Sequence, residues 1–127
     1  MMEISVVIPT YNRKDALARL IDSVYAAGFD AGRHEVIVID DGSCDGTDRL
    51  LNEAAKTRPN FSFKSVKNAG PGQARNTGAG LSRGRIIAFL DDDCVVDGNW
   101  LSEVNRSFAP PQDSPDLCTE KYPAPYA

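Results

Sequence analysis

The sequence has few of the features that mark several classes of protein. It contains no apolar run that approaches the roughly 20 residues of a membrane-spanning helix. Its first residues lack the basic start and the cleavage site of a secretory signal. Its three cysteines are odd in number and too far apart for a zinc pattern. We therefore expect a cytoplasmic protein, with attachment to the periphery of a membrane as the open alternative.

Positive charge is also scarce. The net charge of −4 lacks the basic excess that general nucleic-acid binding requires, so we expect no nucleic-acid partner. The acidic residues gather in two clusters, within residues 40–48 and 91–97, and a mostly basic stretch lies between them. The 127 residues, of which 42% are hydrophobic and 25% charged, are typical of one globular domain.

An apolar run that ends in three consecutive aspartates is the most informative stretch. Residues 86–94 read I-I-A-F-L-D-D-D-C, and the apolar part has the length of a buried strand. Ionised carboxylates are costly inside such a strand, so we expect Asp91, Asp92 and Asp93 just past its C-terminal end. Clustered oxygen ligands suit a hard cation such as Mg²⁺ or Mn²⁺. A solvated acidic turn explains the same three residues equally well.

Strand and helix patterns alternate along the chain. Strand patterns cover residues 3–9, 35–39, 61–66 and 85–90, and helical patterns lie between them and at 99–108. Asn12 is expected to cap the first helix and Gly28 to stop it. The alternation predicts an α/β fold: a three-layer α/β/α, Rossmann-like domain with a mostly parallel sheet. Three polar loops, at residues 10–12, 40–43 and 91–93, each follow a strand. Strand order 3-2-1-4 brings them to one edge of the sheet, where ligands bind in such folds.

Individual residues of these loops have two interpretations each. Asp40 and Asp41 could accept hydrogen bonds from a base or ribose, or form the turn and the helix cap. Tyr11 could stack on a base or cover the end of the core. The glycine-rich residues 70–80 lack the phosphate-loop pattern G-x-x-x-x-G-K-[ST]. They also do not follow the first strand, as the glycine-rich loop of a dinucleotide-binding fold does. Arg75, in the first turn of the helix that follows, could reach a phosphate or lie on a solvated face.

Four stretches, in their order and spacing, resemble the nucleotide-binding half of family 2 inverting glycosyltransferases with the GT-A fold. They are S-V-V-I-P-T-Y-N-R at residues 5–13, V-I-V-I-D-D-G-S-C-D-G-T at 36–47, N-A-G-P-G-Q-A-R-N-T-G at 68–78 and F-L-D-D-D at 89–93. The resemblance covers about residues 3–108, and we expect a partial GT-A domain at residues 1–108.

The resemblance implies a nucleotide-diphosphate sugar as donor, for which a UDP-sugar is the first candidate. It also implies transfer of the sugar to an acceptor hydroxyl with inversion. It also implies a Mn²⁺ or Mg²⁺ ion. In the D-x-D pair, Asp93 would be the direct metal ligand, and Asp91 would lie nearer the ribose or a metal-bound water. The nucleotide site that it implies consists of Pro9, Thr10, Tyr11, Arg13, Asp40, Asp41, Arg75, Asp91 and Asp92.

The C-terminal end departs from the family pattern. Residues 109–127 are rich in proline, and we expect an irregular tail there. The acceptor half and the carboxylate that would act as general base are not found, so we expect a GT-A domain truncated before the acceptor half. Enzymatic activity is therefore open, and a non-catalytic nucleotide-sugar-binding module or a metal-dependent nucleotidyltransferase are the alternatives. Unpaired sheet edges also predict self-association.

Overall fold

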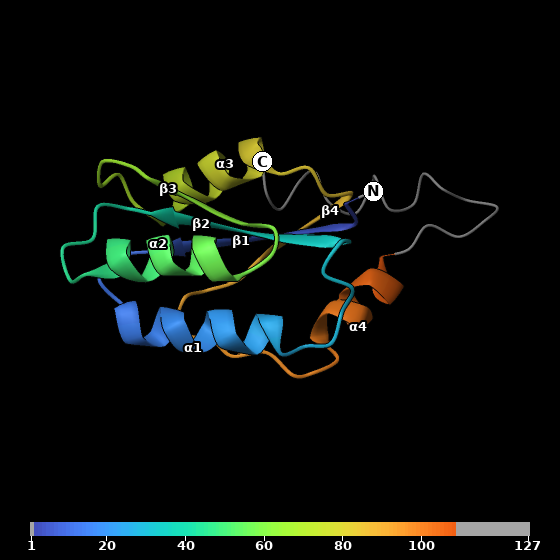
Figure 1. Cartoon of the computed structure of the whole chain (residues 1–127). Coiled ribbons are helices and arrows are strands. Elements are labelled where there is room, and N and C mark those ends of the chain that lie inside the picture. Colours follow the sequence, from blue (N-terminus) through green and yellow to red (C-terminus); the bar gives the residue numbers. More distant parts are fainter. Residues whose placement is uncertain (1, 109–127) are drawn as a thin grey trace.

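The computed structural model describes residues 2–108, which form a single parallel sheet with helices on both faces (Figure 1). The sheet has the strand order β3-β2-β1-β4, and all three strand pairs are parallel. Both the α/β fold and the strand order 3-2-1-4 are therefore confirmed. The elements are β1 (Ile4–Thr10), α1 (Lys14–Tyr25), β2 (His34–Asp40), α2 (Thr47–Thr57), β3 (Phe61–Ser65), α3 (Pro71–Leu81), β4 (Ile86–Phe89) and α4 (Trp100–Ser107). The expected tail at residues 109–127 lies outside the described residues.

The two central strands, β1 and β2, are buried over their full length and divide their side chains between two apolar clusters. Successive residues of a strand point to opposite faces. Val6, Ile8 and Val38 accordingly join the large cluster with α1, α2 and α4, whereas Ile37 and Ile39 pack with Ala74 of α3. Figure 1 shows α3 on one face of the sheet and α1 on the other. This arrangement gives the three layers.

Helix α3 lies very close to the sheet because Gly78 has no side chain. A Cβ atom at Gly78 would stand 2.3 Å from Cγ1 of Val7 in β1 and 3.4 Å from Cγ1 of Ile39 in β2. Carbon atoms in ordinary contact are about 3.5–4.0 Å apart. The glycine therefore sets the depth at which α3 packs, and with it the position of Arg75 one turn earlier in the helix.

One local expectation about the start of α1 is wrong. Arg13, and not Asn12, is the N-cap residue, and no side chain caps the helix. Asn12 has a left-handed backbone, with φ 52°, and its side-chain Oδ1 accepts a hydrogen bond from the backbone N–H of Cys44 at 2.8 Å. Asn12 therefore joins the loop after β1 to the loop after β2. At the other end the helix stops at Tyr25, and Gly28 follows three residues later with a left-handed backbone, φ 70°.

A buried carboxylate stabilises the sheet at the amino end of its strands. Glu35 is 4% exposed and accepts hydrogen bonds from Ser5 Oγ at 2.6 Å, from the backbone N–H of Arg83 at 2.7 Å and from Arg83 Nε at 3.1 Å. Burial acts to raise the pKa of Glu35, but these hydrogen bonds together hold it below its ordinary value. The network anchors the turn between α3 and β4.

Helices long and apolar enough to cross a membrane are absent from residues 2–108.

Candidate functional site

A pocket of about 380 Å³ lies at the carboxyl edge of the strands, between the loop after β1, the start of α3 and the turn after β4. Its volume falls within the usual range for small-molecule sites. The lining residues come from the end of β1 and the loop after it, the residue after β2, the start of α3 and the turn after β4: Pro9, Thr10, Tyr11, Arg13, Asp41, Pro71, Arg75, Asp91, Asp92 and Asp93.

The structure brings together all but one of the residues that the sequence assigned to the site. Asp40 is the exception, because it is buried beside the pocket and its carboxylate accepts the backbone N–H of Ser43 at 3.0 Å. It therefore forms the turn after β2. Pro71 was not anticipated as a lining residue. Its signal in the sequence is its place at the first position of a helix that follows a glycine-rich loop.

The three aspartates after β4 point in different directions. A backbone hydrogen bond from Cys94 N to Asp91 O, at 3.2 Å, closes the turn that carries them. Asp92 is 8% exposed and turns inward, where its Oδ2 accepts a hydrogen bond from Thr10 Oγ1 at 2.9 Å. Asp91 and Asp93 are exposed to solvent and to the pocket. Asp92 thus ties the turn to β1, while the other two carboxylates face solvent and the pocket.

Two arginines from opposite sides of the pocket pair with this turn. Arg13 Nη1 lies 3.2 Å from Asp93 Oδ2 and 3.6 Å from Asp92 Oδ1. Arg75 Nη2, on α3, lies 3.4 Å from Asp91 Oδ1. The pocket lining therefore contains four carboxylates and two guanidinium groups, an excess of negative charge that a divalent cation would balance.

Asp41 supports the wall of the pocket. Its carboxylate accepts the backbone N–H groups of Ala69 at 2.9 Å and Gly70 at 3.0 Å, and its carbonyl accepts Asn68 Nδ2 at 3.0 Å. These contacts fix the loop that leads into α3. Tyr11 is 48% exposed, so its ring stands in the pocket wall and does not close the core.

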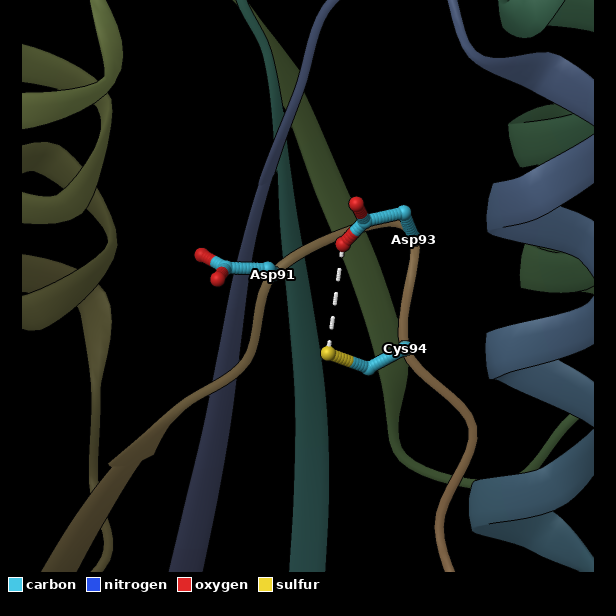
Figure 2. Close-up of side chains that lie close together, drawn as sticks. All are labelled: Asp91, Asp93 and Cys94. Carbon is cyan, nitrogen blue, oxygen red and sulfur yellow. Dashed lines mark hydrogen bonds between the residues drawn. The ribbon is translucent and has the colours of Figure 1, made fainter.

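The donor atoms fit a divalent cation. Asp91, Asp93 and Cys94 each offer one ligand atom, and the three atoms lie within 4.8 Å of one another. Opposite oxygens around a Mg²⁺ ion are about 4.2 Å apart, so small side-chain rotations suffice to bring the two carboxylates to one ion. Figure 2 shows the Asp93 and Cys94 side chains pointing toward each other, with Asp91 turned to the side of α3. The thiol was not anticipated as a donor.

The strand order places this acidic pocket at the switch point of the sheet, where open α/β folds bind their ligands. Residues 5–114 match the family model described as "Glycosyl transferase family 2". The chain belongs to that family.

Curated relatives with similar sequences are longer proteins. One is the glycosyltransferase AglE of Haloferax volcanii, 34% identical over 99 residues that cover 77% of this chain and 33% of the relative. Another is the succinoglycan biosynthesis protein ExoO of Rhizobium meliloti, 40% identical over 95 residues that cover 74% of this chain and 26% of the relative. The chain therefore spans at most about a third of the length of these relatives.

Solved structures show the same fold. The crystal structure of a TarS fragment from Staphylococcus aureus in complex with UDP-GlcNAc superposes with a TM-score of 0.78, at 28% identity, over 84% of this chain and 31% of that one. The mannosyltransferase PcManGT of Pyrobaculum calidifontis, in complex with GDP-Man and Mn²⁺, has a TM-score of 0.75 at 26% identity and covers 86% of this chain and 33% of that one. The proposed identification as a GT-A fold is thereby confirmed.

Proposed function

We propose that this chain is the donor-binding part of an inverting glycosyltransferase. It binds a nucleotide-diphosphate sugar together with Mn²⁺ or Mg²⁺, and a UDP-sugar is the first candidate for that donor. The observation that carries the proposal is the pocket itself. It gathers Tyr11, Asp41 and Arg75 around the same space as the acidic turn at residues 91–93. The TarS complex with UDP-GlcNAc and the PcManGT complex with GDP-Man and Mn²⁺ support the choice of ligand class.

The diphosphate is the part of the ligand that the electrostatics favour most clearly. Arg13 and Arg75 offer planar guanidinium groups, which bind phosphate oxygens through paired hydrogen bonds. The amino end of α3 begins at Pro71 in the pocket wall and adds the partial positive charge of a helix N-terminus. Both features favour an anion between the two arginines.

The metal is assigned to Asp93, with Asp91 beside it. These carboxylates are the exposed pair of the turn, whereas Asp92 is occupied by its hydrogen bond to Thr10. A bound divalent ion would neutralise negative charge on the leaving diphosphate. The chain's own contribution is to hold the turn rigidly against β1, so that the two carboxylates keep their spacing.

The nucleoside would lie between Tyr11 and the loop held by Asp41. The exposed ring of Tyr11 offers a face on which a base can stack. The Asp41 carboxylate is already engaged by two backbone N–H groups, so its main contribution is to shape the wall. A ligand donor could still share either oxygen, since each has a second lone pair.

Transfer with inversion further requires a base that takes the proton of the acceptor hydroxyl. Each aspartate that the structure describes in the pocket wall already has a cationic, hydroxyl or backbone N–H partner. We therefore assign the base to none of these four pocket aspartates. A non-catalytic nucleotide-sugar-binding module remains the second candidate, and an assay for sugar transfer distinguishes the two.

Calorimetry on the native chain tests the proposal. UDP, GDP, UDP-GlcNAc and GDP-mannose are titrated separately, once with Mn²⁺ and once with EDTA. We expect the UDP ligands to bind, and to bind more tightly with Mn²⁺. The proposal is wrong if none of the four ligands binds, or if Mn²⁺ leaves every affinity unchanged.

A further inference from the structure

The position of Arg13 points to a role beyond simple contact with a nucleotide. Its guanidinium pairs with Asp93, the residue assigned to the metal, and also approaches Asp92. A divalent ion on Asp93 and a guanidinium on Asp93 are like charges at the same carboxylate, and they repel each other at that distance. The two therefore compete for one place.

We infer that Arg13 is an exchangeable counter-ion that makes the site select a metal–diphosphate complex over the bare metal. The inference rests on the proposed donor site. When the carboxylates take the ion, the guanidinium is displaced toward the pocket, where the phosphate oxygens of the ligand accept its hydrogen bonds. Bare metal binding breaks the ion pairs of Arg13 without replacing them, so it is disfavoured.

The local structure allows this movement. Arg13 stands at the N-cap of α1, outside the regular helix, and its side chain is 54% exposed. Its ion pairs are therefore surface pairs, which are weak enough to exchange. The backbone around it is fixed instead, because the neighbouring Asn12 and Lys14 donate their N–H groups to Ser43 Oγ at 2.8 Å and to Asp45 Oδ2 at 3.0 Å. Only the arginine side chain has to move.

The charges of the lining also favour an exchange. With the two arginines paired to the turn, no cationic side chain of the described lining is left for a diphosphate. A divalent ion that replaces Arg13 as the partner of Asp93 releases one guanidinium to the anion. Metal and nucleotide then each strengthen the binding of the other, which is a reciprocal coupling.

Bare Mn²⁺ affinity, measured by electron paramagnetic resonance, tests the exchange in the Arg13→Gln variant. The matched control is Arg106→Gln, which removes the same charge from an exposed ion pair with Glu103 on α4. We expect Arg13→Gln to bind bare Mn²⁺ about fivefold more tightly than the native chain. At saturating Mn²⁺ it should bind UDP about tenfold more weakly. Arg106→Gln should leave both affinities within about twofold.

Arg13→Lys separates the charge from the rest of the side chain. Lysine keeps the repulsion, so its bare Mn²⁺ affinity should stay near the native value. The exchange is wrong if Arg13→Gln does not tighten Mn²⁺ binding, or if Arg106→Gln or Arg13→Lys tightens it equally. A native chain that fails to bind UDP with Mn²⁺ contradicts the donor site as well. Native UDP binding together with an unchanged Mn²⁺ affinity in Arg13→Gln contradicts the exchange alone.

Discussion

Replacement of Gly78 by alanine should move α3 away from the sheet and weaken the site that the helix supports. The added Cβ would stand 2.3 Å from Cγ1 of Val7, which is more than 1 Å inside ordinary contact distance. Val7 is fully buried in the central strand β1, so it cannot turn away into solvent. The helix itself must therefore shift, and Arg75 shifts with it.

The magnitude follows from two opposing effects. Overpacking of a buried contact costs about 1–3 kcal/mol, and a contact this short belongs at the upper end. Alanine in place of glycine favours the helix by up to about 1 kcal/mol. We therefore expect Gly78→Ala to lower the free energy of unfolding by about 2 kcal/mol. For a domain of this size that corresponds to a fall in melting temperature of about 8–16 °C.

Gly80 provides the matched control. It lies in the same helix, but a Cβ at Gly80 would have no heavy atom within 4 Å. Gly80→Ala should therefore leave stability unchanged or raise it by about 0.5 kcal/mol. Urea denaturation followed by circular dichroism measures all variants. In the Gly78→Ala background, Val7→Ala should cost at least about 1 kcal/mol less than it does alone. The reasoning is refuted if Gly78→Ala is as stable as Gly80→Ala.

Two further predictions concern Glu35 and Cys94. The folded-state pKa of Glu35 is lowered, so its ionisation contributes stability above the unfolded pKa of about 4.3 and loses that contribution as the pH falls through the folded value. Glu35→Gln should accordingly lower the free energy of unfolding by about 2 kcal/mol at pH 7, and by less below about pH 4. Urea denaturation at several pH values measures this difference. A difference that stays constant across that range would contradict the prediction. Cys94 adds a soft donor beside two hard ones, so Cd²⁺ should displace Mn²⁺ from the native chain at lower concentration than from Cys94→Ser, with Mn²⁺ affinity itself little changed. Equal displacement curves in paramagnetic resonance would show that the thiol is not a ligand.

The fold was predictable because its signals are local. Apolar strand patterns that end in polar residues predict buried parallel strands with a ligand site at their carboxyl ends. Their alternation with amphipathic helices leaves few possible topologies. The same local signals led to Asp91, Asp92 and Asp93. Each carboxylate is placed just past β4 for the reason the sequence suggested: it cannot be buried within the strand.

Contacts between distant segments were beyond the sequence patterns. Asn12 has the residue type of a helix cap, but it bonds to Cys44 in another loop, 32 residues away. Asp41 was a candidate for contact with the nucleobase or ribose and for the turn after its strand, and the structure shows its carboxylate bound to backbone groups of the loop before α3. Arg13 and Asp93 meet only because β1 and β4 are neighbours in the sheet. Such pairings depend on the tertiary fold, which residue type and spacing do not specify.

The dependence of UDP affinity on metal in an Asp93 variant tests the central claim most directly. UDP is titrated into the native chain, Asp93→Asn and Asp97→Asn, each with Mn²⁺ and with EDTA. Asp97 is the control, because it is an exposed aspartate nearby that does not line the pocket. We expect Mn²⁺ to tighten UDP binding about tenfold in the native chain and in Asp97→Asn, and by less than about twofold in Asp93→Asn. An equal gain from Mn²⁺ in all three proteins would contradict the metal–diphosphate site.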